Sequence, residues 1–301
     1  MDWTTLLGEL TPEQFVRDYW HRFPFSMRGT AAELQPLGTW DTLGEILAQR
    51  QVDLMVVRSG ERYAGSDPAD LGEAKSLHEQ GYTILVRHAE RYYRPLHALA
   101  QSFQRTFASP VNVHMYITPA GAHGFSWHYD AEDVFIVQTS GAKEYQLRKN
   151  TVHPWPVVES IPQDMRFDRE IMPLMRVELR AGDWLYVPCG YWHKAEAAAA
   201  DEAAISLAIG VMSRSALDVY DLLRTELVDS LLWRQRLPVG GEALPLSDEE
   251  TTARYREILA QLADDITRRL QSEQLLEACL KQFSAGSDPR RDEAAGGAEG
   301  Q

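Results

Sequence analysis

The chain has 301 residues, of which 44% are hydrophobic and 25% charged, so it can form one sizeable domain with a smaller appendage. Its formal net charge of −14 at pH 7 disfavours direct nucleic-acid binding and favours a basic protein or peptide as partner. The sequence contains no apolar run long enough to predict a membrane span, and the N-terminus lacks a signal-peptide pattern. The two cysteines, Cys189 and Cys279, are expected to be reduced, so we expect a cytoplasmic protein.

Helical patterns dominate the N-terminal part of the chain. Thr11, Pro12 and Gln14 form a helix start, with Thr11 as N-cap and Gln14 at the capping-box position. The sequence also predicts helices over 41–49 and about 91–106, a short strand over 52–57 and a loop over 60–80.

From about residue 110 to 212 the pattern changes to short apolar or alternating runs separated by Gly, Pro, Asp and Asn. This pattern is typical of an antiparallel barrel or jelly roll. We therefore predict a mixed α+β fold: residues 1–212 form a cupin-like double-stranded β-helix, with its barrel core at about 110–212, preceded by helices.

After Met212 the helical pattern returns. Large apolar residues recur at helical spacing over 215–236, Ser247 and Glu250 form a second capping-box pattern, and a last helix is predicted around 275–283. We therefore expect a helical region over 213–283. The residues from Ser284 to the end lack large apolar side chains, which predicts a disordered tail over 284–301.

The segment His128-Tyr129-Asp130 and the later His193 carry the chemistry. If the first three residues lie in a strand, His128 and Asp130 point to one face and Tyr129 points away. His193 follows a Gly-Asp turn and an apolar strand that Pro188 and Gly190 terminate. Two histidines and one carboxylate can form a facial triad that leaves coordination positions open on a non-haem iron.

The stretches YITPAGAHGFSWHYDAEDVFIVQTSGAKEYQL and GDWLYVPCGYWHKAE resemble the JmjC-type 2-oxoglutarate oxygenases, and within them the ribosomal-oxygenase branch. The resemblance is strong over about 110–212 and looser elsewhere. It implies an Fe(II) enzyme that uses 2-oxoglutarate and O₂ and hydroxylates protein side chains at the β-carbon. It also implies that 213–283 mediates dimerisation, hence a homodimer. The branch's C-terminal winged-helix domain is not expected here.

The resemblance also implies a co-substrate site. Lys143 matches the basic residue that pairs with the distal carboxylate of 2-oxoglutarate, which is apt because a buried dicarboxylate needs a compensating cation. Tyr116 matches a tyrosine that contacts the same carboxylate, and Ser206 is a further candidate contact. The alternatives are an exposed strand lysine at position 143, a core tyrosine at position 116 and, for Ser206, no contact with the carboxylate, which is favoured there.

Other polar and aromatic residues near the triad are expected to be structural. His123, in a Gly-rich loop, could line an entrance, but a solvent-facing histidine is the favoured reading. Cys189 lies outside the ligand pattern. Four aromatic residues could form a peptide-binding wall, with core packing favoured for each: Trp127, Tyr129, Tyr191 and Trp192.

Three functions follow, in order of preference. The first is a protein hydroxylase acting on a ribosomal or similar protein, and the second is a hydroxylase that tailors a peptide natural product with the same site. The third is a cupin-like binding protein without turnover, which the intact triad and Lys143 disfavour. Histone demethylation is also disfavoured, because no sequence resembling a chromatin-reading domain is present.

Overall fold

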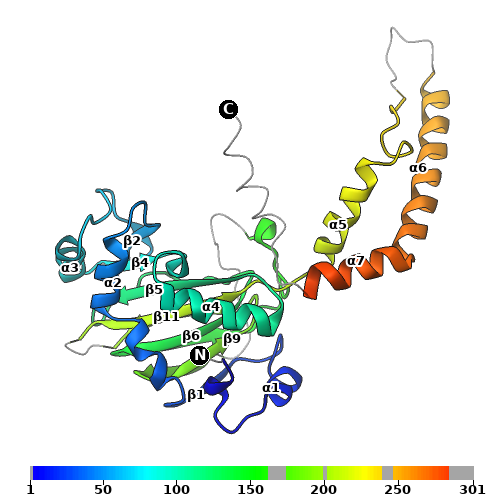
Figure 1. Cartoon of the computed structure of the whole chain (residues 1–301). Coiled ribbons are helices and arrows are strands. Elements are labelled where there is room, and N and C mark those ends of the chain that lie inside the picture. The colour runs from blue at the N-terminus through cyan, green and yellow to red at the C-terminus, as the bar shows by residue number, and fades with distance from the viewer. Residues whose placement is uncertain (1–2, 162–173, 199–201, 239–246, 285–301) are drawn as a thin grey trace. The chain divides into compact units, whose positions relative to one another are not determined.

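The structure, a computed structural model, describes residues 3–161, 174–198, 202–238 and 247–284 (Figure 1). The chain divides into two compact units, the first running to Ser213 and the second beginning at Arg214. None of the helices in these described ranges is long and apolar enough to cross a membrane. The predicted tail lies outside the described residues, except for Ser284.

The helices of the first unit are α1 (Pro12–Asp18), α2 (Trp40–Leu47), α3 (Leu71–Glu79) and α4 (Arg94–Phe107), with 3₁₀ turns η1 (Trp3–Leu7), η2 (Ala32–Leu37), η3 (Ala89–Arg91) and η4 (Val158–Ser160). Its strands are β1 (Phe25–Met27), β2 (Leu54–Arg58), β3 (Glu61–Arg62), β4 (Thr83–Val86), β5 (Val111–Thr118), β6 (Asp133–Ser140), β7 (Ala142–Arg148), β8 (Met175–Arg180), β9 (Trp184–Val187), β10 (Trp192–Ala197) and β11 (Ala204–Val211). The second unit contains α5 (Ala216–Val228), α6 (Asp248–Leu270) and α7 (Glu273–Ser284).

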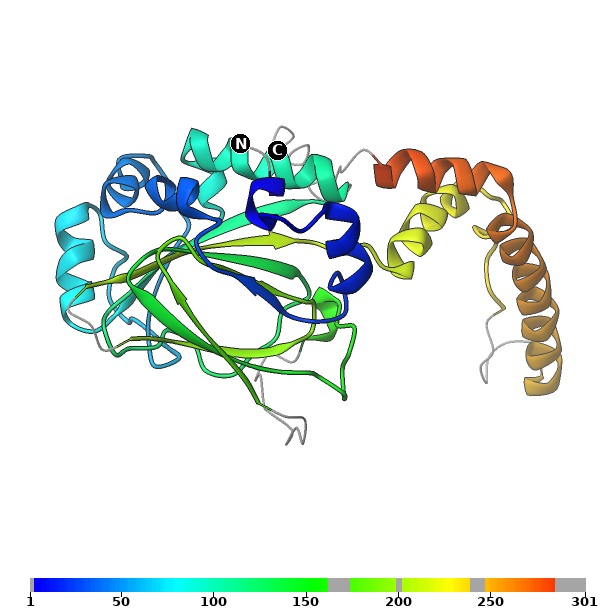
Figure 2. The same cartoon turned by 90° about the horizontal axis from the view of Figure 1, so that it is seen from below.

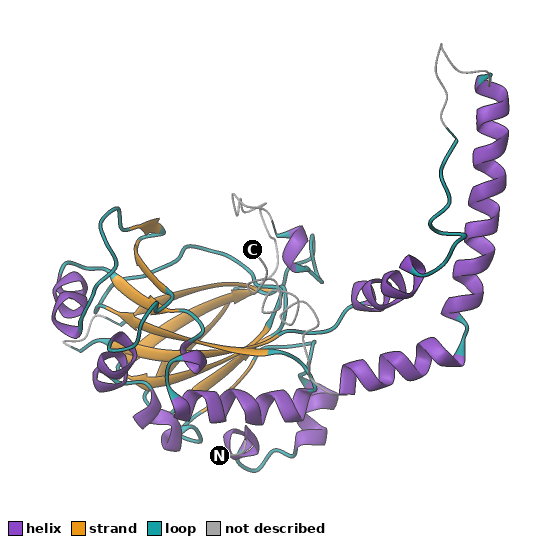
Figure 3. Ribbon diagram, turned by 45° about the horizontal axis from the view of Figure 1, so that its top comes forward, coloured by secondary structure: helices purple, strands orange, loops and turns teal. Residues whose placement is uncertain are grey.

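The strands form two antiparallel sheets, which confirms the predicted jelly roll. The larger sheet has the order β1-β9-β6-β11-β5-β4-β2-β3, and the smaller has the order β10-β7-β8. Figures 2 and 3 show the helices of the first unit gathered mainly along one side of the strands. The fold therefore has a helical layer, a large sheet and a small sheet.

Two apolar cores hold these layers together. One joins the helices to the large sheet and includes Phe15 of α1, Phe103 of α4 and Phe135 of β6, all fully buried. The other lies between the sheets and includes Ile136 of β6 and Leu147 of β7. Along β7 buried and half-buried residues alternate, as a strand with one face toward the core requires.

The capping boxes at Thr11 and Ser247 are confirmed. Thr11 Oγ1 accepts from the Gln14 backbone N–H at 3.2 Å, and Ser247 Oγ accepts from that of Glu250 at 3.2 Å. The helices predicted over 41–49 and 91–106 correspond to α2 and α4, and the strand predicted over 52–57 corresponds to β2.

Two predictions about helices were wrong. The interval 60–80 is not all loop, because it contains β3 and α3. Asp70 caps α3: its Oδ1 accepts a hydrogen bond from the Glu73 backbone N–H at 2.9 Å. Only Ala74 and Leu77 of α3 are buried, so its apolar face was too narrow to detect. The helix predicted over 215–236 ends at Val228, because Asp229 and Ser230 favour turn conformations over helix.

Gly141, in the turn between β6 and β7, is required by its conformation. It adopts a φ of +63°, and a Cβ there would lie 2.8 Å from the Ala203 carbonyl oxygen and 3.0 Å from Ala204 Cα. We expect Gly141→Ala to lower the free energy of unfolding by about 3 kcal/mol, because it adds a backbone clash to left-handed strain. Gly121→Ala is the matched control, since its φ is +67° with nothing within 4 Å of the added Cβ, and it should cost about 1 kcal/mol. Urea unfolding followed by circular dichroism measures both, and equal losses would contradict the packing argument.

Candidate metal centre

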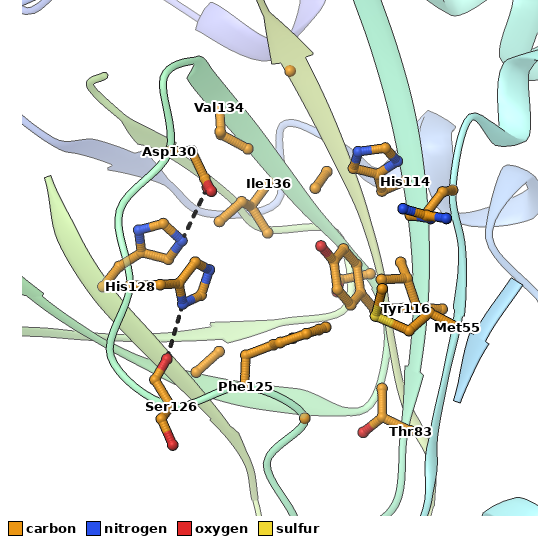
Figure 4. Close-up of a pocket in the computed structure, with 18 of the residues that line it drawn as sticks. Met55, Thr83, His114, Tyr116, Phe125, Ser126, His128, Asp130, Val134 and Ile136 are labelled. Atoms are coloured by element: carbon orange, nitrogen blue, oxygen red, sulfur yellow. Dashed lines mark hydrogen bonds and ion pairs between the residues drawn. The ribbon is translucent and has the colours of Figure 1, made fainter. Parts of the chain in front are cut away.

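The three predicted ligands meet at one point of the barrel. One donor atom from each of His128, Asp130 and His193 lies within 4.8 Å of the other two. His193 Nε2 is 3.4 Å from Asp130 Oδ2, and the two imidazole rings have their centroids 4.2 Å apart (Figure 4). Among the described residues this is the one such group of possible metal ligands.

The backbone around His128 differs from the prediction in one respect. Residues 126–130 do not form a regular strand; an isolated bridge pairs His128 with His193, whose backbone N–H groups and carbonyls bond reciprocally at 3.1 and 2.8 Å. The bridge still directs His128 and Asp130 into the cavity, and Tyr129 is buried against Trp192 with ring centroids 4.6 Å apart. One pair of backbone bonds therefore aligns two of the three ligands.

The hydrogen bonds of the two imidazoles prepare them for a metal. His128 Nδ1 donates to the Ser126 carbonyl at 2.8 Å, and His193 Nδ1 donates to the Tyr191 carbonyl at 3.0 Å. Because a carbonyl only accepts, each ring in its neutral form carries its proton on Nδ1 and keeps the Nε2 lone pair for a metal. Burial, with a smaller effect of His128, lowers the pKa of His193 to about 4, which keeps this ring neutral. Two imidazoles and a carboxylate fit a divalent iron.

The triad opens into a cavity of about 710 Å³ between the two sheets. Its walls include the apolar side chains of Val134, Ile136, Ala195 and Ala208. Lys143, Tyr116 and Ser206 also line this cavity, so the structure places every predicted site residue around one space.

Lys143 is a buried lysine that lies beside neutral groups. Its Nζ donates to Ser206 Oγ at 3.0 Å and lies 5.5 Å from the centre of the Tyr116 ring. In the described part of the chain no carboxylate lies within ion-pair distance of Nζ, and burial lowers the pKa of Lys143 to about 7. Burial also raises the pKa of Tyr116, so its hydroxyl stays a donor. A buried lysine with only neutral partners fits an anionic ligand.

The other candidates have structural settings. Cys189 and Cys279 are free thiols, and Cys189 is not among the clustered metal ligands. His123 is half-buried and does not line the cavity, so it is neither the solvent-facing nor the entrance-lining histidine that the sequence suggested. Its backbone carbonyl accepts a hydrogen bond from the Ser59 N–H at 3.2 Å. The aromatics Tyr129, Tyr191 and Trp192 are buried, whereas Trp127 lines the cavity and packs under Arg148.

Sequence reasoning missed many residues that line the cavity, among them His114, Tyr145 and Thr83. The first two lie two positions from Tyr116 and Lys143 on β5 and β7, so strand alternation could have identified them. Thr83 begins β4, a strand that the sequence pattern did not reveal.

The fold and the site define a cupin-like barrel with a two-histidine, one-carboxylate centre. Residues 88–219 match the JmjC domain family. The chain is 35% identical over 122 residues to the "bifunctional lysine-specific demethylase and histidyl-hydroxylase NO66" of Dictyostelium discoideum, a match covering 39% of this chain and 23% of that protein. It is 25% identical over 207 residues to "ribosomal oxygenase 1" of Gallus gallus, covering 64% of this chain and 33% of the relative. The chain thus spans a third or less of these curated relatives.

A solved structure agrees in fold. The Escherichia coli ribosomal oxygenase YcfD, in complex with cobalt and 2-oxoglutarate, superposes with a TM-score of 0.58 at 18% sequence identity. The match covers 92% of this chain and 71% of YcfD. It confirms the predicted double-stranded β-helix with flanking helices.

Proposed function

We propose that this protein is an Fe(II)- and 2-oxoglutarate-dependent oxygenase that hydroxylates an amino-acid side chain in a protein or peptide. The observation that carries the proposal is the combination in one cavity of three converging metal ligands and the buried Lys143 with only neutral partners. Relatives named histidyl-hydroxylase and ribosomal oxygenase support the same class of reaction.

His128, Asp130 and His193 would hold the iron. When bound, the iron supplies, with 2-oxoglutarate and O₂, the oxidising power that converts a C–H bond to C–OH while 2-oxoglutarate becomes succinate and CO₂. Lys143 and Ser206, whose side chains are hydrogen-bonded to each other, would bind the distal carboxylate, and Tyr116 bounds the same end of the cavity. The apolar wall residues exclude water from the reacting atoms. We assign no protein general base.

Two features support a polypeptide substrate. The cavity of about 710 Å³ leaves room beyond a small dicarboxylate. The loop after β7 exposes three apolar side chains, Trp155 at 86%, Val158 at 56% and Val152 at 54%, and Val158 also lines the cavity. Exposed apolar side chains on a loop that reaches the cavity fit a protein or peptide surface, and the acidic net charge of −14 favours a basic one.

The finer assignments belong to the same proposal: hydroxylation at the β-carbon, a cytoplasmic location, and a homodimer formed through the helical second unit. In that unit Leu223, Leu227 and Leu275 form a small core, while Leu259 and Leu280 are more than half exposed, which supports a role in association.

The test uses short overlapping peptides from ribosomal proteins, together with peptides encoded beside this gene. The protein is loaded anaerobically with Fe(II), and 2-oxoglutarate and air are added. We expect at least one peptide to gain one oxygen atom by mass spectrometry and to stimulate succinate formation. Modification only of a neighbouring-gene peptide would favour the tailoring hydroxylase. A peptide that loses a methyl group instead would contradict hydroxylation.

A further inference from the structure

His114 lies in the cavity but has no part in the reaction described above. It is on β5, two residues before Tyr116, so both side chains project from the same face of the strand. It lines the cavity, and Figure 4 shows it across the open space from His128 and Asp130. It is therefore placed to contact whatever occupies the part of the cavity beyond the metal ligands.

The position of the proton on His114 is fixed by a backbone group. The His88 backbone N–H donates to His114 Nδ1 at 3.1 Å. His88 has a left-handed φ of 53° as it enters η3. Because a backbone N–H only donates, Nδ1 of His114 must be the acceptor, and the proton of the neutral ring resides on Nε2.

The charged surroundings keep this ring neutral. Burial is the main effect that lowers the pKa of His114 to about 4, with His88 and Arg87 acting in the same direction and Glu90 and Asp130 opposing it. Near neutral pH the side chain therefore offers one donor, the Nε2–H group, and no charge.

The Nε2–H group has no protein partner. None of the described residues accepts a hydrogen bond from it, and this nitrogen faces the open space of the cavity. Arg87 lines the cavity too, held by Asp53, whose Oδ1 accepts from Nε at 2.9 Å and from Nη2 at 2.6 Å. The polar groups of His114 and Arg87 are both donors, so they complement an acceptor oxygen.

We propose that His114 determines substrate specificity by donating a hydrogen bond from Nε2 to a carbonyl oxygen of the polypeptide substrate. The inference rests on the proposed function. The dicarboxylate co-substrate is already accounted for at Lys143 and Ser206, whereas a polypeptide carries a carbonyl at every residue. A donor left without its acceptor when a ligand fills the cavity is costly, so such a group also rejects ligands that lack the carbonyl.

The experiment compares two replacements of His114 with the peptide from the ribosomal and neighbouring-gene set that the wild-type protein converts best. Gln places an amide N–H at a reach similar to that of Nε2, whereas Phe keeps a ring and removes the donor. We expect His114→Phe to raise the KM for this peptide about 10- to 100-fold, with a smaller change in kcat, because the lost bond contributes to substrate binding. His114→Gln should stay within about threefold of wild type. His97→Phe, on the exposed face of α4, controls for loss of a histidine.

The outcomes separate the two proposals. If wild type converts a peptide and His114→Phe has the same KM as His114→Gln, the role of His114 is overturned and the proposed function stands. If wild type converts none, the proposed function fails and this inference fails with it. If circular dichroism shows that His114→Phe does not fold, nitrogen NMR of the wild-type protein identifies which ring nitrogen of His114 carries the proton. A proton on Nδ1 instead of Nε2 overturns the inference.

Discussion

Asp130→Ala is expected to abolish 2-oxoglutarate turnover and to weaken Fe(II) binding more than about 100-fold, since even the loss of an outer-shell partner of a metal ligand costs about 10- to 100-fold. The substitution leaves two imidazoles, His128 and His193, without the carboxylate that completes the ligand set. Anaerobic calorimetric titration with Fe(II) measures the binding, and succinate formation measures the turnover.

The control for this variant is His97→Ala, which removes an exposed histidine outside the cavity. It should bind Fe(II) as wild type does. Fe(II) affinity in Asp130→Ala equal to that of this control would mean that the metal is held elsewhere.

Lys143→Met is expected to weaken 2-oxoglutarate binding about 100-fold. Methionine fills a similar volume but removes the charge that would pair with the distal carboxylate, a loss of about 3 kcal/mol for a buried charge-assisted bond. Ser206→Ala removes only the hydroxyl that accepts from Lys143 Nζ, and it should cost about fivefold. Equilibrium binding of 2-oxoglutarate to the metal-loaded protein measures both. Equal, small effects would remove Lys143 from the co-substrate site.

The same lysine predicts a pH dependence of 2-oxoglutarate binding. Burial lowers the pKa of Lys143 to about 7 in the ligand-free protein, and a bound carboxylate would raise it by stabilising the ammonium. The affinity for 2-oxoglutarate should therefore be highest below about pH 7 and should fall by up to about tenfold per pH unit above it. Above about pH 7, binding of 2-oxoglutarate should be accompanied by uptake of a proton by Lys143. Calorimetry in buffers of different ionisation enthalpy measures this uptake. A pH slope in Lys143→Met as steep as in wild type would contradict the assignment.

Much of the barrel was predictable because its strands are short, apolar and separated by turn residues, as in β6 and β9. The capping boxes at Thr11 and Ser247 were predictable because they depend on local chemistry. Helix α3 was not, since its stability rests on Ala74 and Leu77 packing against the rest of the fold and not on a broad apolar face. The strand pairings, such as β6 with β9 and β11, depend on long-range contacts that no local pattern encodes.

The site was predictable only in part. The sequence indicated the three ligands and Lys143, and the structure places these side chains around one cavity. It did not indicate that the ligand segment forms an isolated bridge at His128 instead of a regular strand. It also missed His114, because the role inferred for that residue depends on the His88 N–H, which only the folded chain places beside it.

The most direct test of the oxygenase assignment is incubation of the anaerobically Fe(II)-loaded protein with 2-oxoglutarate and heavy-isotope O₂, followed by mass spectrometry of the succinate. We predict succinate that carries one oxygen atom from O₂, absent from the Asp130→Ala sample. Succinate no more abundant than in the Asp130→Ala sample, or succinate without the heavy isotope, would contradict the assignment of this protein as a 2-oxoglutarate oxygenase.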